Sequence, residues 1–298
     1  MTQLSTEPSQ TRRLKVRHSN HYSYTQPIVR SAHRLHLRPI HDRWQSLVEH
    51  SLVVSSDVAA VDYEDVFGNW TTRFEINQPY SELTIAADSL VELLDADPFS
   101  FAALPNRPVF PINWMPWELK MLTPYLTPIE LPETQLTELY DYAMSFVTRN
   151  NYDLLETLFA INLAIFREFD YVPASTSLET TPYEALVNKK GVCQDFANLM
   201  ICLARLLNIP ARYVCGYVFT GNTGSARAGS DASHAWVQLY LPNVGWKGFD
   251  PTNGVLPSTD HIRMAVGRHY RDTAPIAGTL YSSAGETLSV DVEVSPLE

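Results

Sequence analysis

The hydrophobic pattern changes its period twice along this chain, and these changes limit the folds that it can adopt. From Leu14 to about Leu94, apolar and polar residues alternate in short runs, which is the pattern of half-buried strands. After Pro132 the apolar residues recur every three or four positions, as in amphipathic helices. From Ala211 onward the alternation returns. Strands followed by helices and then by strands again predict an α+β protein.

Three segments follow from this pattern. Residues 13–94 are predicted to form an antiparallel β-sandwich behind a disordered tail of residues 1–12, because short strand-like runs are separated by turn signals such as 65–69. Residues 95–132 contain eight prolines, which fix φ and remove backbone donors, so we expect a connector there rather than regular elements. Residues 133–298 are predicted to be a second domain, with helices near 136–146, 154–165 and 191–207 and strands near 211–220, 233–241, 246–249 and 287–294.

The composition argues against several classes of protein. A net charge of −11 over 298 residues lacks the basic footprint of a nucleic-acid-binding protein and does not favour a membrane surface. No apolar run approaches the ~18–20 residues that span a bilayer, and the polar residues 1–12 do not resemble a secretion signal. We therefore expect a cytoplasmic protein without nucleic-acid or membrane partners. Its oligomeric state is left open.

Three cysteines, Cys193, Cys202 and Cys215, fit neither a disulfide framework nor a thiolate zinc site. Cys193 falls in the first turn of a predicted helix, where unpaired backbone N–H groups and the helix dipole stabilise a thiolate. Cys202 lies nine residues further on, on the opposite face of the same helix, and Cys215 lies inside an apolar strand-like run. Only Cys193 is placed to react, although most free cysteines are small buried residues.

A thiolate nucleophile needs an imidazole to hold its proton and a third group to orient that imidazole. Three histidines follow the cysteines: His234, His261 and His269. His234 begins a strand-like run, and Asp250 ends the next run sixteen residues later, where Pro251 stops the strand. Two adjacent strands would bring His234 and Asp250 side by side, although strand ends also carry polar residues for structural reasons.

Two other features were weighed as sites. The first domain has two groups of histidines that could be read as metal ligands: His18 with His21, and His33 with His36 and His41. Strand residues three positions apart point to opposite faces, so we expect no metal there. Residues 221–229 are rich in glycine but lack the lysine of a phosphate loop. They predict a mobile loop beside the His234 strand that could cover a cleft.

Three blocks of the sequence resemble the bacterial transglutaminase-like superfamily, whose members are often described as cysteine proteases: GVCQDFA at 191–197, SHAWVQLYLPNVGWKGFDPTNG at 233–254 and HIRMAVGRHYRDTAPIAG at 261–278. Parts of the first domain, at 14–37, 65–69 and 83–85, resemble the domain that precedes the core in these proteins. The resemblance implies a papain-like α+β core, with helices packed on an antiparallel sheet. It also implies a triad of Cys193 as nucleophile, His234 as base and Asp250 as orienting acid.

The sequence departs from the animal transglutaminases at Gln194, where those enzymes have tryptophan, and it shows no acidic cluster like their calcium sites. His269 stands where the bacterial pattern usually has an aspartate. Tyr171 is a candidate oxyanion donor beside the backbone N–H of the nucleophile, although packing is the commoner role of such a residue. We expect Asp195 to stabilise the first turn of its helix, Trp236 to form core or pocket wall, and Gln194 to support the pocket.

These residues predict a thiol-dependent enzyme that acts on amide bonds of a peptide or protein and needs no cofactor. The favoured reading is a cysteine peptidase or amidohydrolase that forms an acyl-thioester on Cys193. Two alternatives stay open: an amine-dependent acyltransferase and a non-catalytic protein-binding module on the same core. The intact Cys193, His234 and Asp250 argue against the binding module. Hydrolysis and transfer differ only in whether water or an amine resolves the thioester.

Overall fold

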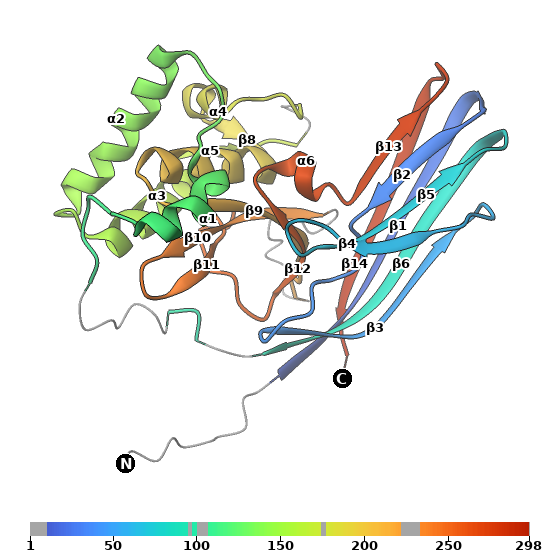
Figure 1. Ribbon diagram of the computed structural model, residues 1–298, viewed down its shortest axis with the longest axis horizontal. Helices are drawn as coiled ribbons and strands as arrows, with labels where there is room; N and C mark the ends of the chain where they lie inside the picture. The colour runs from blue at the N-terminus through green and yellow to red at the C-terminus, as the bar shows by residue number, and fades with distance from the viewer. Residues whose placement is uncertain (1–10, 95–96, 100–106, 174–176, 222–232, 298) are drawn as a thin grey trace.

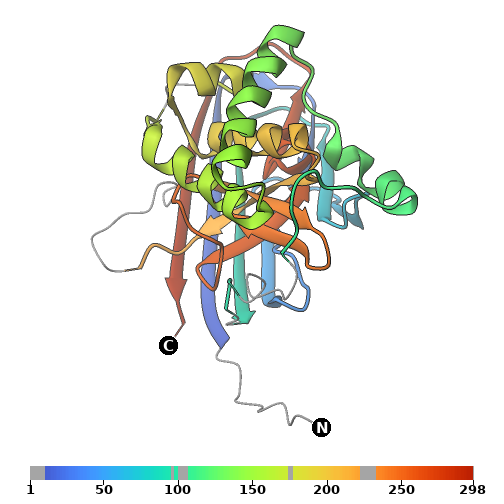
Figure 2. The ribbon, with the colours of Figure 1, turned by 90° about the vertical axis from the view of Figure 1, so that its left-hand side faces the viewer.

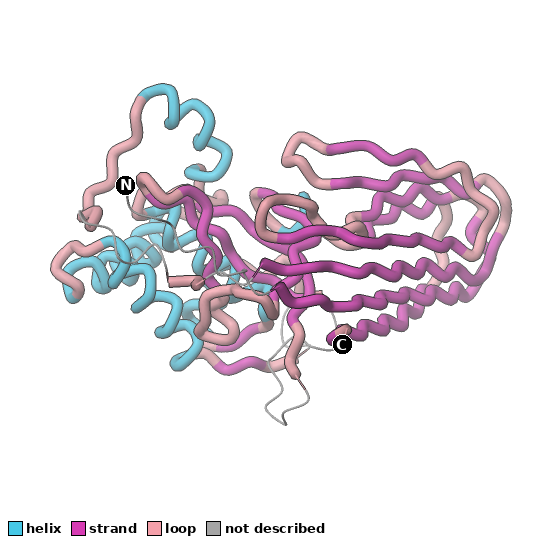
Figure 3. The backbone as a smooth tube through the Cα atoms, turned by 90° about the horizontal axis from the view of Figure 1, so that it is seen from below, coloured by secondary structure: helices cyan, strands magenta, loops and turns pink. Residues whose placement is uncertain are grey.

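The computed structural model describes residues 11–94, 97–99, 107–173, 177–221 and 233–297. Its helices gather at one end of the molecule and its long strands at the other (Figure 1), and the view turned by 90° shows the helices in front of these strands (Figure 2). The separation is clearest when the backbone is coloured by secondary structure (Figure 3). The predicted α+β class with antiparallel sheets is confirmed.

Two four-stranded antiparallel sheets make the strand-rich end. The first has the order β14-β1-β6-β3 and the second has the order β13-β2-β5-β4. Apolar side chains from both sheets share one core, which includes Leu14, Phe74 and Ile85. The predicted sandwich is therefore present. Its strands are β1 (Thr11–Ile28), β2 (Ser31–Leu35), β3 (Gln45–Val54), β4 (Val61–Glu64), β5 (Trp70–Ile76), β6 (Tyr80–Leu94), β13 (Ile276–Leu280) and β14 (Glu286–Pro296).

The last two strands correct the domain boundaries expected from the sequence. β14 pairs with β1 along eleven residue pairs, from Leu14 with Pro296 to Tyr24 with Glu286. β13 pairs with β2, from Ile276 with Leu35 onward. The run at 287–294, which we placed in the second domain of residues 133–298, thus completes the sandwich of residues 13–94. At the other end of β1, Thr11 and Arg12 are strand residues rather than tail, whereas residues 1–10 lie outside the described part.

The second part of the chain builds a four-stranded antiparallel sheet of order β11-β10-β9-β12 with helices on one face. The alternate residues Ala235, Val237 and Leu239 of β10 face the helices and join their apolar core. The predicted helices at 136–146, 154–165 and 191–207 are confirmed as α2 (Glu133–Arg149), α3 (Leu154–Glu168) and α5 (Cys193–Leu206). The strands are β9 (Ala211–Val218), β10 (His234–Leu241), β11 (Gly245–Phe249) and β12 (His261–Gly267).

The proline-rich segment was expected to lack regular elements, and this is wrong for part of it. Residues 116–126 form the helix α1 (Pro116–Leu126), which starts with proline at its first position. Proline is favoured there because its missing N–H has no helical partner in any case. Residues 95, 96 and 100–106 of the same segment lie outside the described part. Four short elements were also not expected, namely β7 (Asp170–Tyr171), β8 (Lys190–Gly191), α4 (Pro182–Asn188) and α6 (Tyr270–Thr273), and neither were the strands β12 and β13.

The sandwich holds β12 through two side-chain amides. Gln45 accepts a hydrogen bond from the Arg263 backbone N–H at 2.8 Å and donates to the Arg263 carbonyl at 2.8 Å. Asn69 accepts from the Val266 N–H and donates to the Val266 carbonyl, both at 2.8 Å. Both amide side chains are almost fully buried. The sandwich therefore fixes the backbone of one strand of the second sheet.

Two further expectations concerned a loop and membrane-spanning segments. Of the predicted mobile loop at 221–229, residues 222–229 lie outside the described part of the chain. Within the described part, no helix is both long and apolar enough to cross a membrane.

Candidate active site

Cys193 is the first residue of α5, as expected. The parallel pair β7 and β8 leads directly into this helix, with Tyr171 opposite Gly191. Asp195 Oδ2 accepts a hydrogen bond from the Val192 N–H at 2.8 Å, and a Cβ at Gly191 would lie only 2.8 Å from the Asp195 Cβ. Glycine is required here because the capping carboxylate approaches the backbone so closely. The entry to α5 is thus fixed locally, and Cys193 remains partly exposed.

His234 begins β10 and is 1% exposed. Its Nε2 lies 2.9 Å from Asp250 Oδ2, so the predicted neighbourhood of these two residues is present. Its Nδ1 is buried and has no hydrogen-bond partner among the described residues. The Cys193 thiol helps to raise the pKa of His234, as expected for a thiol that lies near this imidazole.

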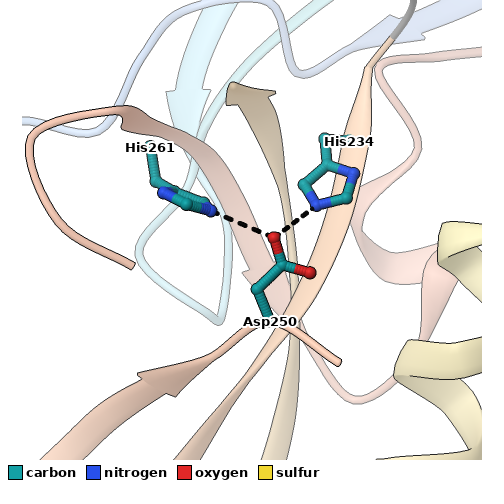
Figure 4. A group of neighbouring side chains, drawn as sticks. All are labelled: His234, Asp250 and His261. Atoms are coloured by element: carbon teal, nitrogen blue, oxygen red, sulfur yellow. Dashed lines mark hydrogen bonds and ion pairs between the residues drawn. The ribbon is translucent and has the colours of Figure 1, made fainter. Parts of the chain in front are cut away.

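Asp250 follows the end of β11 and is fully buried, and its carboxylate accepts from five nitrogen atoms. Oδ1 accepts from the backbone N–H groups of Thr252 and Asn253 at 3.0 and 3.2 Å. Oδ2 accepts from the Asn253 side-chain amide at 2.7 Å and from Nε2 of His234 and His261 at 2.9 and 3.1 Å (Figure 4). An ionised carboxylate only accepts hydrogen bonds, so both imidazoles carry a proton on Nε2. His234 Nδ1 is then free to accept the thiol proton.

The electrostatics of the pair follow from burial and charge together. Burial alone would raise the pKa of Asp250, but the charge of His234 and the hydrogen bonds from His234 and His261 hold it well below its usual range. Burial would likewise lower the pKa of His234, but the Asp250 charge, the hydrogen bond to Asp250 and the contact with Cys193 raise it. Both shifts favour the ionised forms. The site therefore stabilises an imidazolium next to the thiol.

His261 also belongs to this cluster, and its contact with Asp250 was not predicted from the sequence. It begins β12, and its side chain is 2% exposed. Trp236 is fully buried against both histidines, stacked on His234 with ring centroids 5.8 Å apart and edge-on to His261 at 5.2 Å. Trp236 is thus fully buried and also lines a pocket together with His261. The sequence named His261 only as one of three histidines that follow the cysteines. Its contact with Asp250 depends on the order of the strands in the sheet, which the sequence did not predict.

The remaining candidates are placed as follows. Cys202 and Cys215 are buried, and burial raises the pKa of each thiol to about 12, as their structural role implies. His269 is exposed at the start of α6 and takes no part in the cluster. Tyr171 packs edge-on to Phe196, with centroids 6.4 Å apart. Gln194 is half-buried next to the thiol in sequence. The oxyanion and pocket roles given to Tyr171 and Gln194 stay predictions.

Two groups of side chains have the donor atoms of metal ligands. The ligand-type atoms of His234, Asp250 and His261 all lie within 4.8 Å of one another. The Asp250 lone pairs, however, already accept five N–H donors, and these donors would oppose a cation, so the arrangement is that of a hydrogen-bonded carboxylate. In the sandwich, the ring nitrogens of His18 bond to Tyr217 and Asn20 at 2.6 Å each, which gives that histidine a structural role.

Several known proteins are similar to this chain in sequence or in fold. Residues 141–251 match the model of the transglutaminase-like superfamily, and residues 14–92 match the model of the bacterial transglutaminase-like N-terminal region. An uncharacterized protein of Mycobacterium tuberculosis is 32% identical over 313 residues, which cover 99% of this chain and 96% of that protein. A protein-glutamine gamma-glutamyltransferase of Pseudomonas aeruginosa is 28% identical over 112 residues, 33% of this chain and 16% of that protein.

The fold has a solved counterpart. The crystal structure of "a Putative Cysteine Protease from Cytophaga hutchinsonii" gives a TM-score of 0.74 and covers 97% of this chain and 92% of that chain, at 22% sequence identity. This likeness shows that the fold is shared along the whole chain. Taken with the two family matches, it leads to one conclusion: the chain belongs to the transglutaminase-like superfamily and has the N-terminal region of its bacterial members.

Proposed function

We propose that this protein is a thiol-dependent enzyme that cleaves amide bonds of a peptide or protein through an acyl-thioester on Cys193. One observation carries the proposal. A buried imidazole, His234, is bound to Asp250 through one nitrogen and lies beside the Cys193 thiol. This order of thiol, imidazole and carboxylate is the arrangement that activates a nucleophile.

The first half of the reaction forms the thioester. His234 Nδ1 takes the thiol proton, and the Cys193 sulfur adds to the substrate carbonyl carbon. The backbone N–H of Cys193, at the start of α5, is a donor for the resulting oxyanion, with Tyr171 as candidate for the second. The C–N bond then breaks while the imidazolium returns its proton to the leaving amine.

The second half regenerates the thiol. A water molecule gives a proton to His234 and adds to the thioester carbonyl, and the C–S bond breaks as the proton passes to sulfur. Throughout both halves Asp250 remains ionised, because five nitrogen donors surround it, and it orients His234. The acid product and the free Cys193 thiol result.

Acyl transfer to an amine is the second candidate. It uses the same thioester and differs only in the second nucleophile. The partial match to a protein-glutamine gamma-glutamyltransferase supports it, over a third of the chain. Gln194 stands where the animal transglutaminases have tryptophan, so hydrolysis fits this chain at least as well as transfer.

The first test is the reactivity of the thiol. The full chain is treated with iodoacetamide between pH 5 and 8, and alkylation of each cysteine is followed by mass spectrometry of a tryptic digest. We expect Cys193 to react faster than a free thiol and His234→Gln to slow it by about 100-fold. His269→Gln changes a histidine that is exposed and outside the cluster, so it serves as the control. A Cys193 no more reactive than a free thiol would contradict the proposal and leave a binding module.

The second test separates the two reactions. A mixture of synthetic peptides with internal glutamines is incubated with the enzyme, with and without methylamine. The products are then identified by mass spectrometry. Hydrolysis gives cleaved or deamidated peptides, whereas transfer gives methylamide products. Cys193→Ala is the blank for both. Methylamide as the main product would replace the peptidase assignment by the acyltransferase.

A further inference from the structure

His261 binds the carboxylate of the site, yet no step of the reaction above uses it. We propose that His261 is a positioning residue: by sharing Asp250 Oδ2 with His234, it limits how strongly Asp250 holds the proton on His234. The inference rests on the proposed function, because it concerns the release of that proton to the leaving amine. It adds a second imidazole to the site beyond Cys193, His234 and Asp250.

The fold brings the two histidines to one oxygen from opposite sides of β9. β10 and β12 both pair antiparallel with β9, so both strands begin at the same end of the sheet. His234 is opposite Gly216 and His261 is opposite Val218. Their Nε2 atoms converge on Asp250 Oδ2 from the two sides (Figure 4), at 2.9 and 3.1 Å. The two imidazole N–H groups therefore share a single acceptor oxygen.

The ring of His261 is also held in place by contacts other than the one that it shares with His234. Trp236 lies edge-on to it, and the backbone of β12 is tied to the sandwich through Gln45 and Asn69. His261 also lines a pocket of about 140 Å³, together with Trp44 of the sandwich and Trp246 of β11. Such a ring keeps its donor on Asp250 whichever protonation state His234 adopts.

The effect of His261 on the His234 proton follows from the hydrogen-bond donors that surround Asp250 Oδ2. Asp250 Oδ2 accepts from His234, His261 and the Asn253 amide. When His234 loses its second proton, the carboxylate charge is no longer balanced by an imidazolium, and the N–H of His261 then stabilises that charge most. Removing His261 destabilises the state with neutral His234 more than the state with imidazolium. His234 would then keep its proton to a higher pH and release it less readily.

Other charged groups of the described residues also lie near His261. On β12 itself, Arg263 is paired with Asp42 at 2.7 Å, and the preceding Asp260 is paired with Arg12. Across the pocket lie Lys247 of β11 and Asp97. On the side of the site, the facing groups are Asp250, His234 and, beyond them, the Cys193 thiol. A substitution at His261 that keeps these groups isolates its effect on Asp250.

The test uses the full chain labelled with ¹⁵N-histidine and follows the imidazole nitrogens by NMR from pH 5 to 11, in wild type, His261→Phe and His261→Gln. Phenylalanine fills the site without a donor, whereas glutamine supplies a neutral N–H donor. We expect His261→Phe to move the loss of the His234 proton upward by about one pH unit, and His261→Gln to move it by less than half as much. His269→Gln, the exposed control, should move it by less than about 0.2 units.

Two further measurements test the role of His261, and the first needs only the wild-type protein if the phenylalanine variant fails to fold. In wild type, the proton of neutral His261 must reside on Nε2; a proton on Nδ1 with a bare Nε2 would overturn the inference. Alkylation of Cys193 by iodoacetamide is followed in parallel. A reactive wild-type Cys193 with an unshifted His234 in His261→Phe overturns the role of His261 alone. A wild-type Cys193 that is no more reactive than a free thiol overturns the proposed function itself.

Discussion

Replacing Asp250 by asparagine tests the centre of the site with the smallest change in shape. The carboxylate has two acceptor oxygens, and each is surrounded by nitrogen donors from different groups. An asparagine offers one oxygen and one NH₂ group, so whichever way it turns, its NH₂ meets a donor. If the NH₂ faces His234, the imidazole must accept at Nε2 and carry its proton on Nδ1. That tautomer cannot take the proton of Cys193.

The expected magnitudes follow from these contacts. Asp250 and His234 form a fully buried charge pair, and breaking such a pair costs about 3–5 kcal/mol of unfolding free energy. The wrong tautomer of His234 removes the general base, for which we expect Cys193 to react about 10²–10⁴ times more slowly. A thousandfold loss corresponds to about 4 kcal/mol in the barrier. Stability and reactivity should thus fall by similar amounts.

The assay measures both quantities on the same protein. Urea unfolding gives the free energy, and iodoacetamide alkylation mapped by mass spectrometry gives the rate at Cys193, in conditions where the variant is still folded. Asp88→Asn is the matched control, because Asp88 pairs with Arg17 at 3.1 Å on the exposed surface of the sandwich. It should change stability by less than about 1 kcal/mol and leave the alkylation rate unchanged. A folded Asp250→Asn variant that alkylates at the wild-type rate would refute the reasoning.

The chemistry of the site was predictable because most of it is local in sequence. Cys193 follows a glycine and precedes a capping aspartate, so its place at a helix start can be recognised within five residues. His234 and Asp250 lie on two strands joined by a short turn, and hairpin neighbours are the easiest long-range contact to foresee. Asn253 could have been found by the same logic, because it lies in the turn that begins at Asp250.

His261 could not be assigned in this way. Its contact with Asp250 requires β12 to pair with the far edge of β9, and the pairing shifts in register between Arg263 and Ala265. The alternation of apolar residues gives the faces of a strand but neither its neighbour nor its register. The tie from Gln45 and Asn69, which fixes this strand, comes from residues about two hundred positions away. Only the assembled sandwich supplies that information.

The same limit explains the wrong domain boundary. The run 287–294 is correctly predicted as a strand, but its period is equally compatible with either sheet system, and the chain returns to β1 across the whole protein. The error at α1 has another cause. Prolines were taken to exclude regular structure, although Pro116 stands at the one helical position where proline is favourable. The same helix also contains Pro124 in its last turn, so a proline-rich segment does not by itself exclude a helix.

Three further outcomes are expected. Since burial raises the pKa of Cys202 and Cys215 to about 12, both should resist iodoacetamide at pH 8 in the folded protein and react only in urea, which a mass map of the alkylated thiols checks. Gly216→Ala should cost more than about 3 kcal/mol in urea unfolding, because its Cβ would lie 2.0 Å from a backbone oxygen of β12; an unchanged midpoint would contradict this close approach. The advantage of wild type over Asp250→Asn in unfolding free energy should depend on pH at both ends. The lowered pKa of Asp250 contributes stability above its unfolded value of about 3.9 that is lost as the pH falls. The raised pKa of His234 contributes stability below its unfolded value of about 6.5 that is lost as the pH rises. Urea unfolding of both proteins from pH 3 to 10 should therefore show the largest difference between about pH 4 and 6.5, and a difference independent of pH would show that the two groups do not interact as charges.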